Sequence, residues 1–188
     1  MYKEKEVGAT IYGVDAEEEE LVTNYPSAMV EGEFISKLDR GEIVLGRELS
    51  GGYGAVMQTR SLEDVSVGDI VTVMVDGQEM NFRVKGIYST LFFMSDSSAF
   101  VNKKDLEEAL NAEDKAHEIA IKIRDDADEE YVREEILFTW SAGRSTHLAG
   151  ICRVYIENNR SHAFHGQEYF HCSWSYCSVY YHFCGYFL

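Results

Sequence analysis

The sequence predicts an α+β fold in which a mixed β-sheet with a hairpin-rich subregion packs against two to three helices. Three observations support this class. Apolar, β-branched runs of strand length recur along the first part of the chain. Short helical segments stand between them, the first of which follows an N-capping residue, and an Asp-Gly pair joins two of the apolar runs. We expect an irregular C-terminal tail after this fold, because neither strand alternation nor a helical period persists there.

The first predicted strand lies within residues 8–14, and a helix follows over residues 16–22. Asp15 is the expected N-cap, since its side chain can accept a hydrogen bond from a backbone N–H of the first helical turn. The acidic run at residues 17–20 is compatible with a metal or partner site or with a first helical turn. We expect the helical turn, because carboxylates there interact favourably with the helix dipole.

The next segment contains a turn at residues 31–34 and a buried strand at residues 42–46. A strand–turn–helix step is expected at Gly46. The glycines in residues 46–54 also suggest a phosphate-binding loop, in which backbone N–H groups approach a phosphate. We reject that site because no Gly-Lys-Ser/Thr follows, the G-x-G-x-x-G spacing is absent, and the neighbouring residues are acidic.

A β-hairpin is the most clearly patterned part of the chain. Residues 67–69 form a turn, residues 70–75 a β-branched strand, Asp76-Gly77 the hairpin turn, and residues 80–88 a strand of alternating apolar and polar residues. The sequence therefore predicts a two-stranded ribbon with one buried face.

An apolar cluster, Leu91-Phe-Phe-Met94, follows the hairpin. It is compatible with a partner-binding ridge or with a loop directed into the core. We expect the core-facing loop, because large apolar side chains are more often buried. A strand at residues 98–101 and a helix at residues 103–110, begun by Asn102, come next, and the helix has apolar residues at helical spacing.

Beyond this helix we expect a strand at residues 117–123 and a further helix that ends near Leu137. Residues 125–130 are acidic but lack the ligand positions and the glycine of a calcium loop, so we expect them at the N-terminus of that helix. His117 is the one histidine before the tail and has no nearby cysteine, serine or second histidine that would form a catalytic or metal site. We expect it at the surface.

The chain of 188 residues is strongly acidic, with 17 basic and 33 acidic side chains and a formal net charge of −16. This charge repels nucleic acids and anionic lipid surfaces, so we expect no nucleic-acid partner. Residues 1–137 contain no nucleophile–base pair and no ligand cluster, which predicts no catalytic residues, no metal and no cofactor. We also expect neither a signal peptide nor a transmembrane helix in the chain as written, because it has no apolar h-region and no run of about 20 apolar residues.

Several segments occur in a fixed order along residues 8–137, after a short lead at residues 1–7. They are Gly13-Val14-Asp15, Glu31-Gly32, Ile43-Val-Leu-Gly-Arg-Glu-Leu49, Val67-Gly-Asp69, Phe82-Arg-Val-Lys-Gly-Ile87, and Ala99-Phe-Val101 before a helix. This order resembles the extracytoplasmic core domain of MacB/FtsX-type ABC transporter permeases, and the succession of Val-Gly-Asp, a strand and Val-x-Gly-Ile is its most specific part.

The resemblance implies a domain on the extracytoplasmic side of the cell membrane, between transmembrane helices, with no catalytic residues. It implies an ABC ATPase subunit and a second permease copy as partners. The domain would couple ATP-driven motion to a transported substrate or an envelope partner. It does not indicate which residues bind that partner.

The C-terminal tail, residues 138–188, has a different composition. It carries only five charged side chains but holds all four cysteines, both tryptophans and every histidine except His117. An alternative interpretation is therefore a small soluble acidic enzyme or metal-binding protein that uses this tail. The Cys-x4-Cys-x6-Cys spacing lacks a second Cys-x2-Cys-like knuckle, so we expect no metal site. The candidate ligands would be His171, Cys172, Cys177, His182 and Cys184.

A reading-frame error would also explain the tail, which is rich in His, Cys, Tyr and Phe. All codons for these four residues end in T or C, so a shift of frame changes them in a restricted way. Read one nucleotide later, residues 171–187 give roughly 17 positions compatible with apolar residues, the length of a membrane span. The resembling family has a transmembrane helix shortly after this domain. We therefore hypothesise a frameshift near residues 137–143, with the tail in place of a transmembrane segment. Nucleotide sequencing across codons 135–145 would test the hypothesis.

Overall fold

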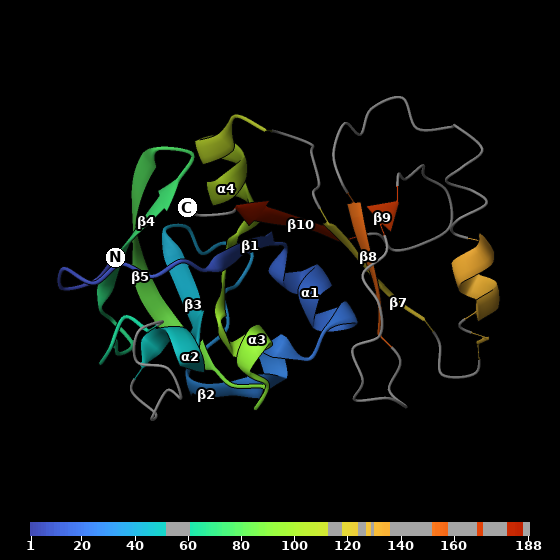
Figure 1. Cartoon of the computed structure of the whole chain (residues 1–188), viewed down its shortest axis with the longest axis horizontal. Helices are drawn as coiled ribbons and strands as arrows, with labels where there is room; N and C mark the ends of the chain where they lie inside the picture. The colour runs from blue at the N-terminus through green and yellow to red at the C-terminus, as the bar shows by residue number, and fades with distance from the viewer. Residues whose placement is uncertain are drawn as a thin grey trace. The chain divides into compact units, whose positions relative to one another are not determined.

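The computed structural model describes residues 1–51, 61–112, 118–123, 127–128, 130–135, 152–157, 169–170 and 180–185. The chain forms two compact units (Figure 1). The first contains Met1–Asp114 with Phe183–Leu188, and the second contains Lys115–His182.

The first unit is built on a mixed β-sheet, which confirms the predicted α+β class. Its strands pair in the order β2-β5-β3-β6-β1, and β4 pairs with β5. The pairs β3/β5 and β1/β6 are parallel, and the pairs β2/β5, β3/β6 and β4/β5 are antiparallel. Residues 183–185 of β10 (Tyr180–Gly185) pair antiparallel with β1. The strands are β1 (Thr10–Val14), β2 (Met29–Gly32), β3 (Glu42–Gly46), β4 (Ile70–Val75), β5 (Gln78–Tyr88) and β6 (Ser98–Asn102).

Short helices connect these strands. The helices predicted at residues 16–22 and 103–110 are confirmed as α1 and α4. Asp15 is the N-cap of α1, as predicted, and Asn102 is that of α4. Asp15 accepts a hydrogen bond from the backbone N–H of Glu17 at 3.2 Å, and Asn102 accepts one from that of Lys104 at 3.1 Å. The helices are α1 (Ala16–Val22), the 3-10 helix η1 (Tyr25–Ala28), α2 (Arg47–Ser50), α3 (Phe93–Asp96) and α4 (Lys103–Leu110).

Alternation along the strands divides the core between the two faces of the sheet. In β3, Ile43 and Leu45 belong to the larger cluster and Val44 to the smaller one. The larger cluster contains Leu106 of α4 and the inward side chains of the β4–β5 ribbon. The smaller cluster is centred on Phe100 and includes residues from α1 and β5. Each face of the sheet is therefore covered by its own connections.

The predicted β4–β5 hairpin is confirmed. Its turn residues Asp76 and Gly77 have φ values of 47° and 78°, both in the left-handed region. A two-residue turn of this kind matches the twist of the flanking strands and favours an Asp-Gly sequence. β5 begins at Gln78, two residues earlier than expected.

The chain between α1 and β3 differs from the prediction. We expected a turn at residues 31–34, but β2 continues to Gly32 and pairs with β5. Gly32 has a φ of 67°, and a Cβ there would collide with the carbonyl of Lys85. The glycine therefore permits the close approach to β5. This strand was missed because its partner lies about 55 residues away in the sequence, where local patterns carry no signal.

Residues 1–7, expected as a lead before the domain, contact the edge of the sheet. The backbone N–H of Thr72 in β4 donates to the carbonyl of Met1 at 2.9 Å, and the hydroxyl of Tyr2 donates to Asp69 at 2.8 Å. Tyr2 and Val7 also pack against the larger core cluster. The first residues are thus part of the folded unit.

The second unit contains β7 (Glu118–Lys122), which lies within the strand predicted at residues 117–123. β7 pairs in parallel with β8 (Cys152–Glu157) and antiparallel with residues 180–182 of β10, and β8 pairs antiparallel with β9 (Tyr169–Phe170). Residues 130–135 are helical.

The described segments of the tail are strands where we expected irregular structure. In β8 the run Val154-Tyr-Ile156 consists of β-branched and aromatic residues, which favour extended pairing. The domain boundary after Leu137 and the frameshift hypothesis stay predictions.

Candidate partner-binding surface

Leu91, Phe92 and Met94 form an exposed apolar ridge at the turn between β5 and β6. Their side chains are 88%, 44% and 72% exposed, so the expected core-facing loop is wrong. The reason is that Leu91 has a φ of 62°, in the left-handed region, which turns the chain outward before α3 begins. A leucine in this conformation costs about 1 kcal/mol or more, so its surroundings must hold it there.

Asp96 provides that support from beneath the ridge. Its side chain is 2% exposed and accepts three hydrogen bonds, from the Ser89 hydroxyl at 2.8 Å and from the backbone N–H and hydroxyl of Thr90 at 2.7 Å each. A buried carboxylate requires such donors to compensate for its lost hydration. The residues that precede the ridge are therefore tied to α3.

Tyr88 anchors the same turn from the core. Its hydroxyl donates to the carbonyl of Ser95 at 2.5 Å and lies 3.2 Å from that of Ser98. Burial raises the pKa of Tyr88 well above its usual range, so the phenol remains a neutral donor. Gly46 at the end of β3 completes the support, because a Cβ there would clash with the backbone of Asp96. The ridge consequently stands on a tightly packed base.

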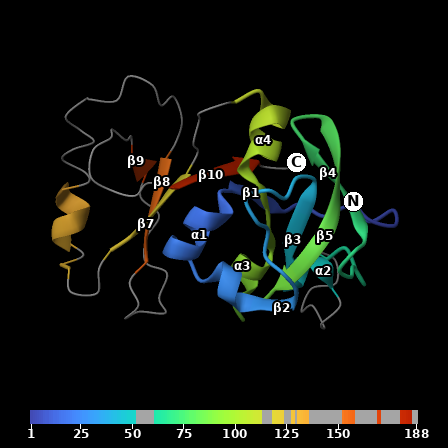
Figure 2. The same ribbon diagram turned by 180° about the vertical axis from the view of Figure 1, so that it is seen from behind.

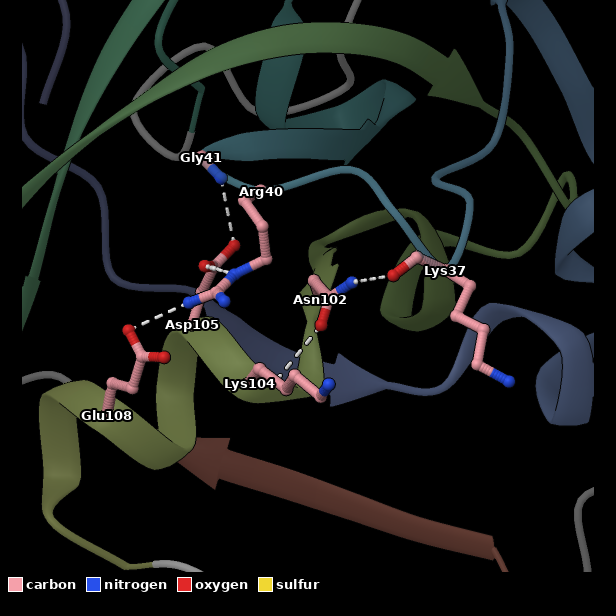
Figure 3. A network of polar contacts seen from close by, with 7 residues as sticks. All are labelled: Lys37, Arg40, Gly41, Asn102, Lys104, Asp105 and Glu108. Carbon is pink, nitrogen blue, oxygen red and sulfur yellow. Dashed lines mark hydrogen bonds and ion pairs between the residues drawn. The ribbon is translucent and has the colours of Figure 1, made fainter.

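A second polar network fixes the chain that enters β3 (Figure 3). Arg40 donates from Nε to Asp105 at 2.5 Å and forms an ion pair with Glu108 at 2.8 Å, both on α4. The backbone N–H of Gly41 donates to Asp105 at 3.0 Å, and the side chain of Asn102 donates to the carbonyl of Lys37 at 3.1 Å. We call this set the Arg40 clamp. Figures 1 and 2 show α4 and α3 at opposite ends of the strands, so the clamp and the ridge are separate surfaces.

An adjacent ion pair joins the same segment to β5. Lys85 is paired with Asp39 and lies 3.5 Å from Glu42, and Asp39 also accepts a hydrogen bond from the backbone N–H of Ser36 at 2.6 Å. Partial burial alone would raise the pKa of Asp39, but the hydrogen bonds from Lys85 and Ser36 outweigh it and lower the pKa below its usual value. The native state therefore favours the ionised carboxylate.

We expect Asp39→Asn to remove a pH-dependent part of the stability. Because the pKa of Asp39 in the native state lies below its unfolded value of ~3.9, the ionised carboxylate stabilises the fold. This contribution is complete above about pH 5 and is lost as the pH falls through the native pKa. The variant should be less stable than the wild type at pH 7, with a difference that shrinks toward pH 2. Urea unfolding at a series of pH values measures it. Asp64→Asn, at an exposed aspartate, is the control, and a difference that does not vary with pH would contradict the assignment.

The acidic run after Asp15 has the structural role that we expected. Glu17, Glu18 and Glu19 occupy the first turn of α1. Glu19 is 1% exposed and accepts a hydrogen bond from the Thr23 hydroxyl at 2.6 Å, and Glu17 forms an ion pair with Lys37 at 2.8 Å. Over the described residues, no group of three or more His, Cys, Asp or Glu side chains could hold a metal ion.

The glycine-rich segment has a packing role at the positions that the structure describes. Gly51 ends α2 with a φ of 75°, and a Cβ there would come within 2.8 Å of Glu63. Gly52 and Gly54 lie outside the described residues, as do His117, residues 125–126 and the histidines and aromatic residues of the tail between its strands. Asp128 caps the helical residues 130–135 by accepting hydrogen bonds from the backbone N–H groups of Glu130 at 3.0 Å and Tyr131 at 3.1 Å.

Sequence reasoning missed the Arg40 clamp entirely. Arg40 and Asp105 are 65 residues apart, and no local pattern connects them. The one available signal was the spacing of Asp105 and Glu108, which places both carboxylates on one face of a helix. That spacing alone does not identify the basic partner.

The comparisons with known proteins give one match. The family model of the MacB-like periplasmic core domain matches residues 1–137. No curated protein and no solved structure matches the chain. In the part of the chain that the structure describes, no helix has the length and hydropathy of a membrane span.

Proposed function

The chain belongs to the family of MacB-like periplasmic core domains, the extracytoplasmic domains of MacB/FtsX-type ABC transporter permeases, and from this premise we propose a non-catalytic coupling function. An ABC ATPase subunit hydrolyses ATP, and membrane helices of the permease carry the resulting motion. The domain transmits this motion to a transported substrate or an envelope partner. A second permease copy completes the transporter.

The family match over residues 1–137 is the observation that carries this proposal. The apolar ridge adds support, because exposed apolar side chains that are held on a rigid base are typical of partner-binding surfaces. Leu91 and Met94 present their side chains to solvent, while Asp96 and Tyr88 below them are buried. We assign the ridge as the part of the domain that contacts the partner.

The packing of β3 fits a domain that moves as one body. β3 begins at Glu42, directly after Gly41 of the Arg40 clamp, and ends at Gly46, which packs against Asp96 beneath the ridge. Residues 43–46 are all buried in the sheet. Close-packed interiors of this kind transmit displacement with little internal compression. A displacement at α4 would therefore reach the ridge with little loss.

The alternative of an enzyme or metal-binding protein that uses the tail has no support from the comparisons. The family match ends at residue 137, before the tail begins. A coupling domain instead requires a contact surface and a rigid scaffold.

Site-specific photocrosslinking in cells tests the proposal. A photoreactive phenylalanine analogue replaces Leu91 in the intact permease that carries this domain, produced together with its ATPase subunit. We expect crosslinks to a substrate or envelope partner, with a yield that changes at least about threefold when the ATPase subunit is made inactive. The reason is that coupled motion must alter how the ridge engages its partner.

Leu38 provides a matched control, because it is as exposed as Leu91, at 87%, but lies between Lys37 and Arg40 of the Arg40 clamp. The same analogue at Leu38 should give no ATPase-dependent crosslink. An equal yield at Leu91 with active and inactive ATPase would contradict the coupling function.

A further inference from the structure

In the part of the chain that the structure describes, one edge of β5 is open along its first half. Arg83 is aligned with Ile70 of β4 and with Glu42 of β3, so β4 and β3 lie on opposite sides of β5. The pairing with β3 begins at Arg83. Among the described residues, no strand pairs with residues 78–82 on the β3 side.

The backbone groups of Glu79 and Asn81 point toward this open side. The N–H of Arg83 donates to Gly41 at 2.9 Å, next to β3, and the N–H of Val84 donates to Asp69 at 2.8 Å, next to β4. Because successive N–H groups of a strand point in opposite directions, those of Glu79 and Asn81 point to the same side as that of Arg83. No described residue accepts a hydrogen bond from these two N–H groups, which are thus donors on the edge of the sheet.

The Arg40 clamp explains why the segment that precedes β3 does not fill this position. Gly41 has a φ of 67°, and its N–H is bonded to Asp105 of α4. Arg40 is held by Asp105 and Glu108 on the same helix (Figure 3). The segment that enters β3 is therefore bound to α4 and does not run alongside residues 78–82 of β5.

A shallow, open groove of about 360 Å³ lies beside this edge, lined by Gly41, by residues of β5 and by Asp105, Glu108 and Ala109 of α4. Phe82 is buried beneath it and Ala109 of α4 lines its far wall. The groove is thus bounded by an unpaired strand edge on one side and by a helix on the other.

The groove carries excess negative charge. Asp105 and Glu108 line it, and Arg40 compensates only one of their two charges. On the exposed face of the same strand Glu79 and Arg83 carry opposite charges, so the excess comes from the two carboxylates on α4. The chain as a whole has a net charge of −16, which strengthens the attraction for a basic ligand.

We propose that residues 78–82 of β5 are a strand-addition site for an extended polypeptide segment with basic side chains. The segment would continue the line of β3, pair with the N–H and C=O groups of Glu79 and Asn81, and place the basic side chains of one of its faces near Asp105 and Glu108. Main-chain pairing provides the affinity of such sites, and alternate side chains provide the specificity. This site is separate from the apolar ridge and adds a second contact to the domain.

Titration of the full 188-residue chain with a defined peptide tests the proposal. The probe is acetyl-Lys-Val-Lys-Val-Lys-amide, and acetyl-Glu-Val-Glu-Val-Glu-amide is its charge-reversed counterpart. We expect saturable binding of the lysine peptide, with chemical-shift changes at the amides of Glu79 and Asn81, and at least about tenfold weaker binding of the glutamate peptide.

Two proline variants separate the open edge from the ribbon as a whole. Glu79→Pro removes one free N–H, and Met74→Pro is its control, because Met74 is the cross-strand neighbour of Glu79 and its N–H points away from β5. We expect Glu79→Pro to weaken binding about tenfold and Met74→Pro to leave it unchanged. Glu79→Gln, which keeps the N–H, should weaken binding less than Glu79→Pro. If Glu79→Pro does not fold, Ala109→Trp, which fills the groove from α4, takes its place and should also weaken binding.

The absence of saturable binding, or equal losses in Glu79→Pro and Met74→Pro, would overturn the proposal. So would self-association in sedimentation experiments that Glu79→Pro abolishes, since the occupant of the edge would then be a second copy of the chain. None of these results depends on crosslinking at Leu91, so the proposed coupling function is tested independently.

Discussion

Val84→Asp is expected to lower the free energy of unfolding by about 4 kcal/mol, enough to unfold many domains of this size. Val84 is 1% exposed and lies in the larger core cluster with Phe82 and Leu106. The aspartate would have no basic partner among these apolar side chains. Folding would therefore require either the desolvation of an unpaired carboxylate or its protonation, and both cost free energy. Urea unfolding followed by circular dichroism measures the loss.

Asn81→Asp, on the same strand, is the matched control. Asn81 is exposed, and its Oδ1 already accepts a hydrogen bond from the Thr72 hydroxyl at 2.9 Å, which a carboxylate can also accept. This variant should change stability by less than about 0.5 kcal/mol. Wild-type stability of Val84→Asp would show that the faces of β5 are reversed.

Phe100→Ala is expected to cost about 3–5 kcal/mol, the range for removing a large buried ring. Phe100 is fully buried. The centroid of its ring lies 4.7 Å from that of Tyr25 and 5.3 Å from that of Tyr88, and the ring centroids of Tyr12 and Phe34 are each 5.5 Å away. These rings come from separate elements that meet only in the smaller core cluster. The cavity left by the alanine would therefore loosen the packing of η1 and of the base beneath the ridge.

Phe92→Ala makes the same chemical change on the ridge, where the side chain is 44% exposed. Its cost should be well below that of Phe100→Ala, because part of the ring is already in water. Thermal unfolding of the two variants in parallel distinguishes them. Similar losses would mean that the ridge aromatic is as important to the core as Phe100.

The two surfaces identified on the first unit differ in chemistry. The ridge displays Leu91 and Met94, which suits an apolar partner surface, whereas the groove beside α4 offers free backbone groups and carboxylates. They lie at opposite ends of the strands, as α3 and α4 do in Figure 1.

Local sequence patterns were sufficient to predict the elements that interactions between neighbouring residues stabilise. Asp15 and Asn102 cap helices within their own neighbourhoods, and Asp76-Gly77 closes a hairpin whose strands are adjacent in the chain. Alternation along residues 80–88 identified the strand because one side of the ribbon is buried. The ordered segments also indicated the family that the match over residues 1–137 establishes.

Contacts between distant segments required the tertiary structure. The sequence by itself determined most strands, the capped helices, the acidic character and the family. Only the tertiary structure decided that Leu91 faces solvent, that Arg40 is bound to Asp105, and that one edge of β5 has no partner among the described strands. The physical reason is that helix caps and tight turns depend on interactions over a few residues, whereas burial and edge pairing depend on which remote segments occupy the neighbouring space. In this chain the N–H of Gly41 is hydrogen-bonded to Asp105, 64 residues away, and this contact holds the segment before β3 against α4.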